Sequence, residues 1–217
     1  MKMASRAYYT SDPTLFSIVR EEIADFEYFN GFSISQKQKS IQSLHRSIQL
    51  SHPDKNILEI SSKSPNPLGV KLSAFNLSLY DQSLQRQVPV ENIFQSSKVF
   101  ENGGPYRDLL LVSSREAKQD PRIRDSGYLL KFNYNDIDWD LIPRTAFYDW
   151  LYIQALNSNK ELSEQILNYD IFTDIEFNAK RSINCQARSA AMFVSLVRSD
   201  RLESVLISRT YFLNQYF

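Results

Sequence analysis

Apolar residues recur at helical spacing in the otherwise polar segment 33–50. They share one face of the expected helix and are Ile34, Ile41, Leu44 and Ile48. Ser33 or Ser35 can cap the start of this segment, because a serine side chain accepts a hydrogen bond from a free amide of the first turn. Residues 57–64 alternate between apolar and polar side chains until two prolines interrupt them. The pattern predicts a helix followed by a short strand.

The hydrophobic pattern changes from alternating to helical between residues 69 and 105. Residues 69–80 alternate with one slip, which predicts a second strand with a local irregularity. Pro89 suits the first position of a helix, since that position needs no amide hydrogen. The residues that follow read VENIFQSSKVF and end at the turn-forming run NGGP (102–105). We therefore expect a helix over residues 89–100.

Helical patterns dominate the rest of the chain. Residues 113–125 predict a short helix interrupted by a proline, and residues 145–159 predict a strongly apolar helix that continues through 160–167. A loop over 168–184 leads to a final buried helix over 185–205, which is rich in small and apolar residues. Together these elements predict an α-rich α+β fold with a few short N-terminal strands and a helical core.

Composition narrows the classes of function. The chain has 217 residues, 42% of them hydrophobic, and 25 lysines and arginines balance 25 aspartates and glutamates. A net charge of zero argues against a large basic face for nucleic acid, but leaves open an enzyme that takes one nucleotide into a pocket. One cysteine, Cys185, excludes an internal disulfide and a cysteine-based zinc site. His45 and His52 lack a carboxylate at metal-ligand spacing, so no metal is expected.

We expect a cytoplasmic protein with no membrane partner. The N-terminus has no apolar stretch of signal-peptide length, and no run of about 18 apolar residues occurs in the chain. The single cysteine fits a reducing compartment.

Three polar residues of the expected helix 89–100 form a chemical pattern. Glu91, Gln95 and Lys98 stand at positions i, i+4 and i+7, so they share one helix face over about 10 Å. An acid and an amine that face one pocket can transfer a proton and trap an electrophilic carbon. The same spacing also suits a solvated helix face with an incidental ion pair.

Five segments of the chain resemble the NADAR superfamily in order and spacing, over about residues 69–200. They are GVKLSAFNLSL, VPVENIFQSSKVF, EAKQDPRI, WDLIPRTAFYDWLYIQALNSNKELSEQIL and the closing loop with its helix. The most specific of these is E-x-x-F-Q-x-x-K-x-F. Further segments, from near Phe26 onward, resemble the branch encoded beside a DarT-type toxin, the DarG-type antitoxins. They are ISQKQKSIQSLH, ILEISSKS, FQSSKVFENGGPY and FTDIEFN with SINCQARSAA.

The resemblance implies a NADAR fold and a hydrolase that needs no cofactor. It divides the chain into an N-terminal extension (1–68) packed on the core and a NADAR catalytic domain (69–217). In the toxin-linked branch the implied activity is an ADP-ribosyl glycohydrolase that removes ADP-ribose from guanine in DNA. Its partners would be ADP-ribosylated guanosine in DNA, ADP-ribose and a DarT-type toxin.

The resemblance also assigns three catalytic residues. Glu91 would move the proton, and Lys98 would attack the anomeric carbon and hold the opened sugar as a Schiff base. That step requires burial to lower the pKa of the Lys98 amine. Asp174, in the position of the family's W-G-D loop, would bind ribose hydroxyls or assist proton transfer. An Asx turn is its alternative role.

Six further residues would bind ADP-ribose according to the same resemblance. Arg188 would hold the diphosphate from the start of the last helix. Gln95 would orient the base or a ribose hydroxyl, and Phe75 would stack on a base. The other three residues occupy family positions, and they are Arg122, Asn76 and Phe172. Phe75 suits core packing equally well, and Arg188 also suits a surface position.

Two departures from the family pattern bear on the substrate. Pro121 stands where the family has glycine, before Arg122 and after Lys118, so the backbone there cannot be identical. The loop before the final helix, DIEFNAKRSINCQAR, contains no glycine. Side chains would have to contact phosphate in place of backbone amides, and the candidates are Asn178, Lys180, Asn184 and Gln186.

Two other functions fit the same residues. A non-catalytic antitoxin would bind the toxin or the modified DNA, and the aromatic segment 26–32 with the polar helix 33–50 suits such a surface. A small-molecule riboside N-glycosidase is the second alternative. The combination of Glu91, Gln95 and Lys98 favours catalysis, since a pure binder needs no paired acid and amine.

Overall fold

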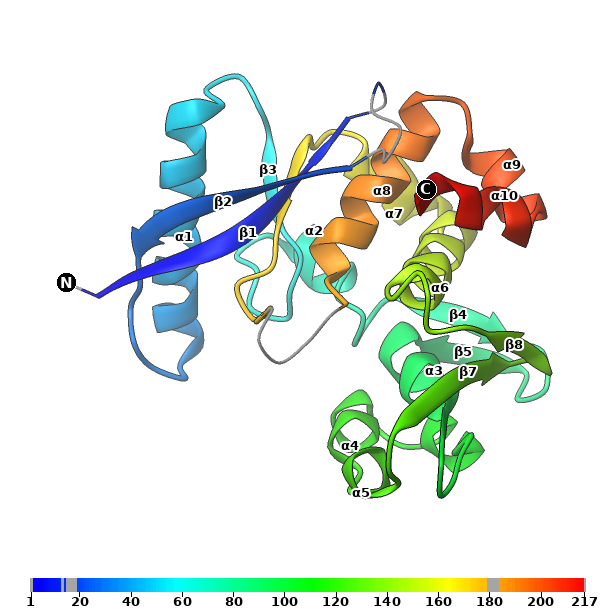
Figure 1. Ribbon diagram of the computed structural model, residues 1–217. Helices are drawn as coiled ribbons and strands as arrows, with labels where there is room; N and C mark the ends of the chain where they lie inside the picture. Colours follow the sequence, from blue (N-terminus) through cyan, green and yellow to red (C-terminus); the bar gives the residue numbers. More distant parts are fainter. Residues whose placement is uncertain (1, 13, 15–18, 179–183, 217) are drawn as a thin grey trace.

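A four-stranded sheet joins the two ends of the sequence (Figure 1). The computed structural model describes residues 2–12, 14, 19–178 and 184–216. The strand order is β2-β1-β9-β3, with bounds Val19–Glu27, Met3–Ser11, Ile171–Thr173 and Ile57–Glu59. β1 is antiparallel to both β2 and β9, whereas β3 and β9 are parallel. The N-terminal 68 residues thus share one sheet with the later part of the chain.

Helices cover both faces of this sheet. Residues of α1 (Ile34–Ser51) pack with Tyr8 on one face, while residues of α8 (Gln186–Arg198) belong to the same apolar cluster as Tyr9 on the other. Successive strand residues point to opposite faces, so adjacent tyrosines serve two different clusters. The predicted start of α1 is confirmed, because the Ser33 hydroxyl accepts a hydrogen bond of 3.3 Å from the Gln36 amide.

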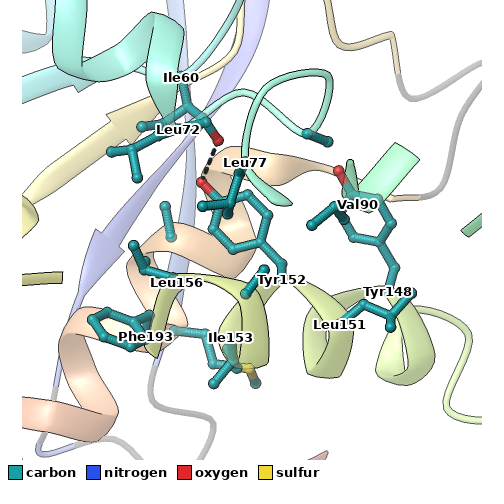
Figure 2. Packing of buried hydrophobic residues seen from close by; sticks show 14 of the residues in the cluster. Ile60, Leu72, Leu77, Val90, Tyr148, Leu151, Tyr152, Ile153, Leu156 and Phe193 are labelled. Carbon is teal, nitrogen blue, oxygen red and sulfur yellow. Dashed lines mark hydrogen bonds between the residues drawn. The ribbon is translucent and has the colours of Figure 1, made fainter. Parts of the chain in front are cut away.

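The apolar helix α6 (Ala146–Ser158) lies in the larger core, as its composition predicts (Figure 2). Tyr152 is fully buried within it, and its hydroxyl donates a hydrogen bond of 2.8 Å to the Leu72 carbonyl. Each large apolar side chain buried here contributes about 1.5–3 kcal/mol, and the tyrosine hydroxyl keeps a partner. The other C-terminal helices are α7 (Lys160–Ile166), α9 (Leu202–Ile207), α10 (Arg209–Leu213) and the short η2 (Asn214–Tyr216).

The middle of the chain forms two small sheets with short helices beside them. β4 (Ser78–Asp81) pairs with β5 (Arg86–Pro89), and β7 (Leu129–Tyr134) lies between β6 (Lys98–Phe100) and β8 (Ile137–Trp139). The helices of this region are α2 (Pro67–Lys71), α3 (Val90–Ser96), η1 (Arg107–Leu110), α4 (Ser114–Gln119) and α5 (Arg122–Asp125). α4 and α5 confirm the short helix predicted to break at a proline.

The strand predicted over residues 69–80 is wrong. Its first part is helix α2, and only Ser78–Tyr80 belong to a strand. Asn66 caps this helix, because its side chain accepts a hydrogen bond of 2.9 Å from the Leu68 amide. Gly69 lies so close to the Glu59 carbonyl that a Cβ would come within 1.9 Å of that oxygen. The Asn66 cap and the close packing at Gly69 explain why this segment is helical. Neither feature is visible in the alternation of apolar and polar residues.

The helix predicted over residues 89–100 is too long. It ends at Ser96, and Lys98 begins strand β6, where it is paired in register with Phe132. The hydroxyls of Ser96 and Ser97 both donate to the Ile93 carbonyl, at 3.0 and 2.7 Å. Such bonds compete with helix propagation, and the two residues after Lys98, valine and phenylalanine, favour a strand.

Four further differences concern the segments before residue 65 and after residue 167. Strands β1 and β2 lie in the predicted extension, where the sequence had not predicted them, and the predicted strand 57–64 shrinks to β3. The predicted loop 168–184 contains β9. The predicted last helix is divided into α8 and α9, with Asp200 at a φ of 56° between them. The mixture of strands and helices agrees with the predicted α+β class.

Candidate active site

A cavity of about 1130 Å³ lies where the N-terminal elements meet the middle of the chain. Five of the predicted site residues line it: Phe75, Glu91, Gln95, Lys98 and Asp174. Ligand pockets commonly span about 300–1,000 Å³, so this cavity has room for a dinucleotide-sized molecule. The lining combines aromatic rings with charged groups of both signs.

Hydrogen bonds connect the acid, the amide and the amine in series. Lys98 Nζ donates to Gln95 Oε1 at 2.7 Å, and Gln95 Nε2 donates to Glu91 Oε1 at 2.8 Å. Glu91 and Gln95 lie one turn apart on α3, as predicted. Lys98 reaches the same place from strand β6, so the three residues meet although the helix ends before Lys98. The amide of Gln95 keeps the acid and the amine from forming a direct ion pair.

Burial makes Lys98 an unusually weak base. The pKa of its amine is lowered from 10.5 to about 8, chiefly by burial. The carboxylate of Glu91 opposes this shift, and the ammonium group of Lys118 adds to it. Lys98 Nζ lies 4.9 Å from the centre of the Phe94 ring, which forms part of its apolar surroundings. The sequence-based mechanism requires such a lowered pKa.

Glu91 lines the cavity and is only 5% exposed. Lys118 Nζ stands 3.7 Å from Glu91 Oε1 and 5.2 Å from the centre of the Phe75 ring. Phe75 therefore faces the cavity beside a cation, and is available for stacking on a planar group. The position of Lys118, which precedes the family's arginine, brings a second amine to the acid.

Asp174 follows β9 directly and lines the cavity while it shapes its own loop. Its Oδ1 accepts hydrogen bonds from the amides of Glu176 and Phe177 at 3.0 and 3.1 Å. Its Oδ2 accepts one from Gln186 Nε2 at 3.0 Å. Burial and the carboxylate of Glu59 raise the pKa of Asp174 to about 8, so the proton is retained near neutral pH. Asp174 therefore forms the Asx turn and also lines the cavity, while its role towards a substrate stays a prediction.

A buried polar network next to Asp174 was not predicted from the sequence, and it consists of Glu59, Thr173 and His45. Glu59 accepts hydrogen bonds from the Thr173 hydroxyl at 2.5 Å and from the Ile175 amide at 2.8 Å. Thr173 Oγ1 is also 2.9 Å from His45 Nε2, which must donate because the threonine proton is used for Glu59. Burial lowers the pKa of His45 to about 4, which keeps its ring neutral. No local pattern links these three elements, since the contacts join α1, β3 and β9.

Arg188 is not among the described residues that line the cavity, although it does lie in the first turn of α8. Its Nη1 donates to Asp149 Oδ2 and to the Thr145 hydroxyl, and its guanidinium lies 5.3 Å from the centre of the Tyr216 ring. Its partner Asp149 is 1% exposed, so Arg188 neutralises a buried charge. We therefore do not assign the diphosphate to Arg188.

Three other predicted ligand contacts also lie outside the described cavity lining. Arg122 pairs on the surface with Asp108 and Asp120, at 2.6 and 2.9 Å. Asn76 donates to the Val70 carbonyl at 2.8 Å and stabilises the turn after α2. Phe172 is fully buried in the sheet. The contacts that the structure shows for these three residues are with the protein itself, and their roles in ligand binding stay predictions.

Several cavity residues were not anticipated from the sequence. They include Arg6 on β1, Tyr28 after β2, Lys37 on α1, and Arg144 with Tyr148 at the start of α6. Asn178, Asn184 and Gln186, proposed from the glycine-free loop, do line the cavity, whereas Lys180 lies outside the described residues. The N-terminal contributors have no local motif, because only sheet formation brings them here.

Three remaining observations on the described residues concern the cysteine, possible metal ligands and the helices. Cys185 is buried, and burial raises the pKa of its thiol, so it is an inert core residue. Within the described residues, no three His, Cys, Asp or Glu side chains are grouped as a metal site requires. None of the described helices has the length and apolar character needed to cross a membrane.

Comparison with protein families identifies the chain. Residues 4–217 match the family described as DarT1-associated NADAR antitoxin. The match covers nearly the whole chain, which therefore belongs to this family. A search of curated proteins returns no match. Membership confirms the resemblance to the toxin-linked NADAR branch and supports an antitoxin role in a DarT system.

Proposed function

We propose that this member of the DarT1-associated NADAR antitoxin family is an ADP-ribosyl glycohydrolase. It removes ADP-ribose from guanine bases of DNA and so reverses the modification made by a DarT-type toxin. The observation that carries the proposal is the series Glu91–Gln95–Lys98 in the wall of a large cavity, with an amine whose pKa is lowered to about 8.

The lowered pKa makes Lys98 usable as a nucleophile at neutral pH. About one in ten Lys98 amines is uncharged at pH 7 if the pKa is about 8, against roughly one in 3,000 for a lysine of pKa 10.5. A lysine that only held phosphate would work best as a permanent cation. The burial of this amine therefore favours covalent catalysis over simple anion binding.

The proposed reaction begins with cleavage of the bond between the ribose C1 and guanine. Asp174 donates its proton to the departing guanine nitrogen, and the uncharged Lys98 amine donates its electron pair to C1. Glu91 takes up the proton that the new ammonium group loses. Glu91 returns this proton to the ring oxygen as the bond between that oxygen and C1 breaks, which leaves C1 joined to Lys98 as a protonated imine.

Water completes the reaction. It adds to the imine carbon while Glu91 accepts its proton. Glu91 then returns this proton to the Lys98 nitrogen, the bond between that nitrogen and C1 breaks, and the hydroxyl proton left on C1 passes to Asp174, which is thereby restored as the acid. The sum is addition of one water to the ADP-ribosyl guanine, which yields free guanine in DNA and free ADP-ribose. Gln95 holds the acid and the amine at fixed positions throughout.

The experiment is release of ADP-ribose from an oligonucleotide that carries ADP-ribosylated guanosine. We expect the wild type to release it, and Lys98→Ala and Glu91→Gln to lose more than about 100-fold in kcat/KM. Lys71→Ala, on the surface away from the cavity, is the matched lysine control and should keep full activity. Reduction with borohydride during turnover should attach the sugar to the peptide that contains Lys98.

The two alternatives give different results. A non-catalytic antitoxin would bind the toxin or the modified oligonucleotide tightly without releasing ADP-ribose. A riboside N-glycosidase would hydrolyse small ribosides and leave the oligonucleotide unchanged. Release with no borohydride adduct would keep the hydrolase and remove the imine from its mechanism.

A further inference from the structure

The N-terminal wall of the cavity carries two cations whose function is not explained by the proposed chemistry. Arg6 lies on strand β1 and Lys37 on helix α1, and both line the cavity that holds Lys98 and Asp174. Arg6 is paired in register with Ala24, and alternation along β1 places it on the face that α1 covers, with Ala4 and Tyr8. The strand therefore directs the guanidinium towards the cavity beside α1.

The guanidinium of Arg6 is short of partners. Its Nη1 donates to the Ser5 carbonyl at 3.0 Å, while its Nε is buried and has no hydrogen-bond partner. Among the described residues, no carboxylate forms an ion pair with it. Leaving a buried donor unpaired costs about 1–3 kcal/mol, so an anion in the cavity would gain a donor already stripped of water.

Lys37 adds a second cation to the same wall. Its Nζ is 2.9 Å from Glu176 Oε1 and 6.0 Å from the centre of the Tyr28 ring. Burial lowers the pKa of Lys37, but the ion pair with Glu176 outweighs burial and leaves the pKa raised. The amine therefore stays charged. Glu176 has a side chain that is 42% exposed, so it can turn to solvent when another anion arrives.

Three of the four acids of the neighbouring strand face away from Arg6. On β2, the exposed residues Glu21, Ile23 and Asp25 share one face, while the buried Ala24 and Phe26 face α1. The acids Glu21, Asp25 and Glu27 therefore point away from the face on which Arg6 lies, whereas Glu22 shares that face and stands 3.7 Å from His52 Nε2. Glu176 forms an ion pair with Lys37.

We propose that Arg6 and Lys37 form a phosphate-binding subsite in this cavity. The inference rests on the proposed function, in that the substrate has phosphates of two kinds: the diphosphate of ADP-ribose and the backbone phosphates of DNA. A guanidinium binds phosphate through parallel N–H groups, and a neighbouring ammonium adds a point charge. The subsite takes the role that the sequence analysis gave to Arg188, which is committed to Asp149.

Binding is measured without turnover, so that the subsite and the catalytic proposal can fail separately. Calorimetry with free ADP-ribose is compared for the wild type, Arg6→Gln, Lys37→Gln and the control Lys39→Gln, whose side chain is exposed on the same helix. We expect the Kd for ADP-ribose to rise by about 10- to 100-fold in the first two variants. The control should match the wild type. The same proteins are titrated with an unmodified single-stranded oligonucleotide.

The outcomes distinguish the two sources of phosphate. Weaker binding of ADP-ribose assigns the subsite to the diphosphate, whereas weaker binding of the oligonucleotide alone assigns it to the DNA backbone. The subsite is refuted if folded Arg6→Gln and Lys37→Gln bind both as the wild type does, or if the wild type binds neither. If Arg6→Gln does not fold, Arg6→Lys replaces it in the binding measurements. This variant keeps the positive charge but lacks the parallel N–H groups of the guanidinium.

The proposed function is judged by its own assay. A wild type that binds ADP-ribose through Arg6 but releases none from modified DNA would keep the subsite and refute the hydrolase. If the wild type, Arg6→Gln and Lys37→Gln all release ADP-ribose at the same rate, the hydrolase is kept and the phosphate subsite is refuted.

Discussion

Lys98 places a charge in the cavity wall at a cost to stability, and Lys98→Met should stabilise the folded protein while it abolishes activity. The perturbation is close to isosteric, because methionine fills the stem of the lysine side chain and has no charge. Functional groups held at unfavourable positions are a recognised source of such stability gains. The prediction concerns folding alone, so it holds whatever the substrate is.

The magnitude follows from the pKa of Lys98. Lowering that pKa from 10.5 to about 8 corresponds to about 3 kcal/mol by which folding disfavours the charged amine. The substitution also removes the 2.7 Å hydrogen bond to Gln95, which is worth about 1.5–3 kcal/mol for a charged donor. We therefore expect the free energy of unfolding at pH 7 to rise by up to about 1.5 kcal/mol.

The stability gain of Lys98→Met should depend on pH, because the pKa of Lys98 differs between the folded and the unfolded state. Below pH 8 both the folded and the unfolded state hold the Lys98 proton, so the wild type bears the full cost. Between pH 8 and 10.5 the unfolded state binds more protons, so the cost diminishes as the pH rises. The advantage of Lys98→Met should thus be full at pH 7 and almost gone by pH 10.

Urea unfolding of both proteins at pH 7 and pH 10 measures this difference. Other groups that titrate are common to the two proteins and cancel. Lys71→Met, whose lysine is 58% exposed in a 3.6 Å ion pair with Glu161, is the control and should change stability by less than about 1 kcal/mol at either pH. A destabilised Lys98→Met, or a gain equal at both pH values, would refute the buried-amine reasoning.

Three further predictions test other parts of the structure. Because burial lowers the pKa of His45 from 6.5 to about 4, urea unfolding should show about 3 kcal/mol of stability lost as the pH falls through that window; a His45→Gln protein with the same pH slope would contradict this. Arg188→Met should cost about 3 kcal/mol of stability by leaving Asp149 buried without its cation, with unchanged ADP-ribose affinity in calorimetry; weakened affinity in the folded variant would return Arg188 to the binding site. Gly69→Ala should cost more than about 2 kcal/mol, because its Cβ would stand 1.9 Å from the Glu59 carbonyl; an unchanged Tm would disprove the close approach.

Local patterns were sufficient for several of the helices. The face of α1, its serine cap, the break between α4 and α5, and the apolar α6 all follow from residues within one or two turns of each other. Helical hydrogen bonds join residue i to residue i−4, so the information lies inside the segment. The pairing of Glu91 with Gln95 was predictable for the same reason.

The strands and the N-terminal wall of the cavity could not be predicted from local patterns. β1 meets β9 across most of the chain length, and no local pattern in Met3–Ser11 encodes that partner. Arg6 and Lys37 reach the cavity only through this pairing and through the packing of α1. Lys98 shows the same limitation within one motif, since the sequence placed it on a helix and the pairing with Phe132 places it on a strand.

The sequence by itself determined the family, the order of the helices and the residues Glu91, Gln95 and Lys98 as a chemical set. Tertiary structure decided which charged groups are buried, and therefore the low pKa of Lys98 and the high pKa of Asp174. It also separated Arg188, held by Asp149, from the cavity. The physical reason is that proton affinity and charge pairing depend on distance and on exclusion of water, which arise only when segments remote in the sequence pack together.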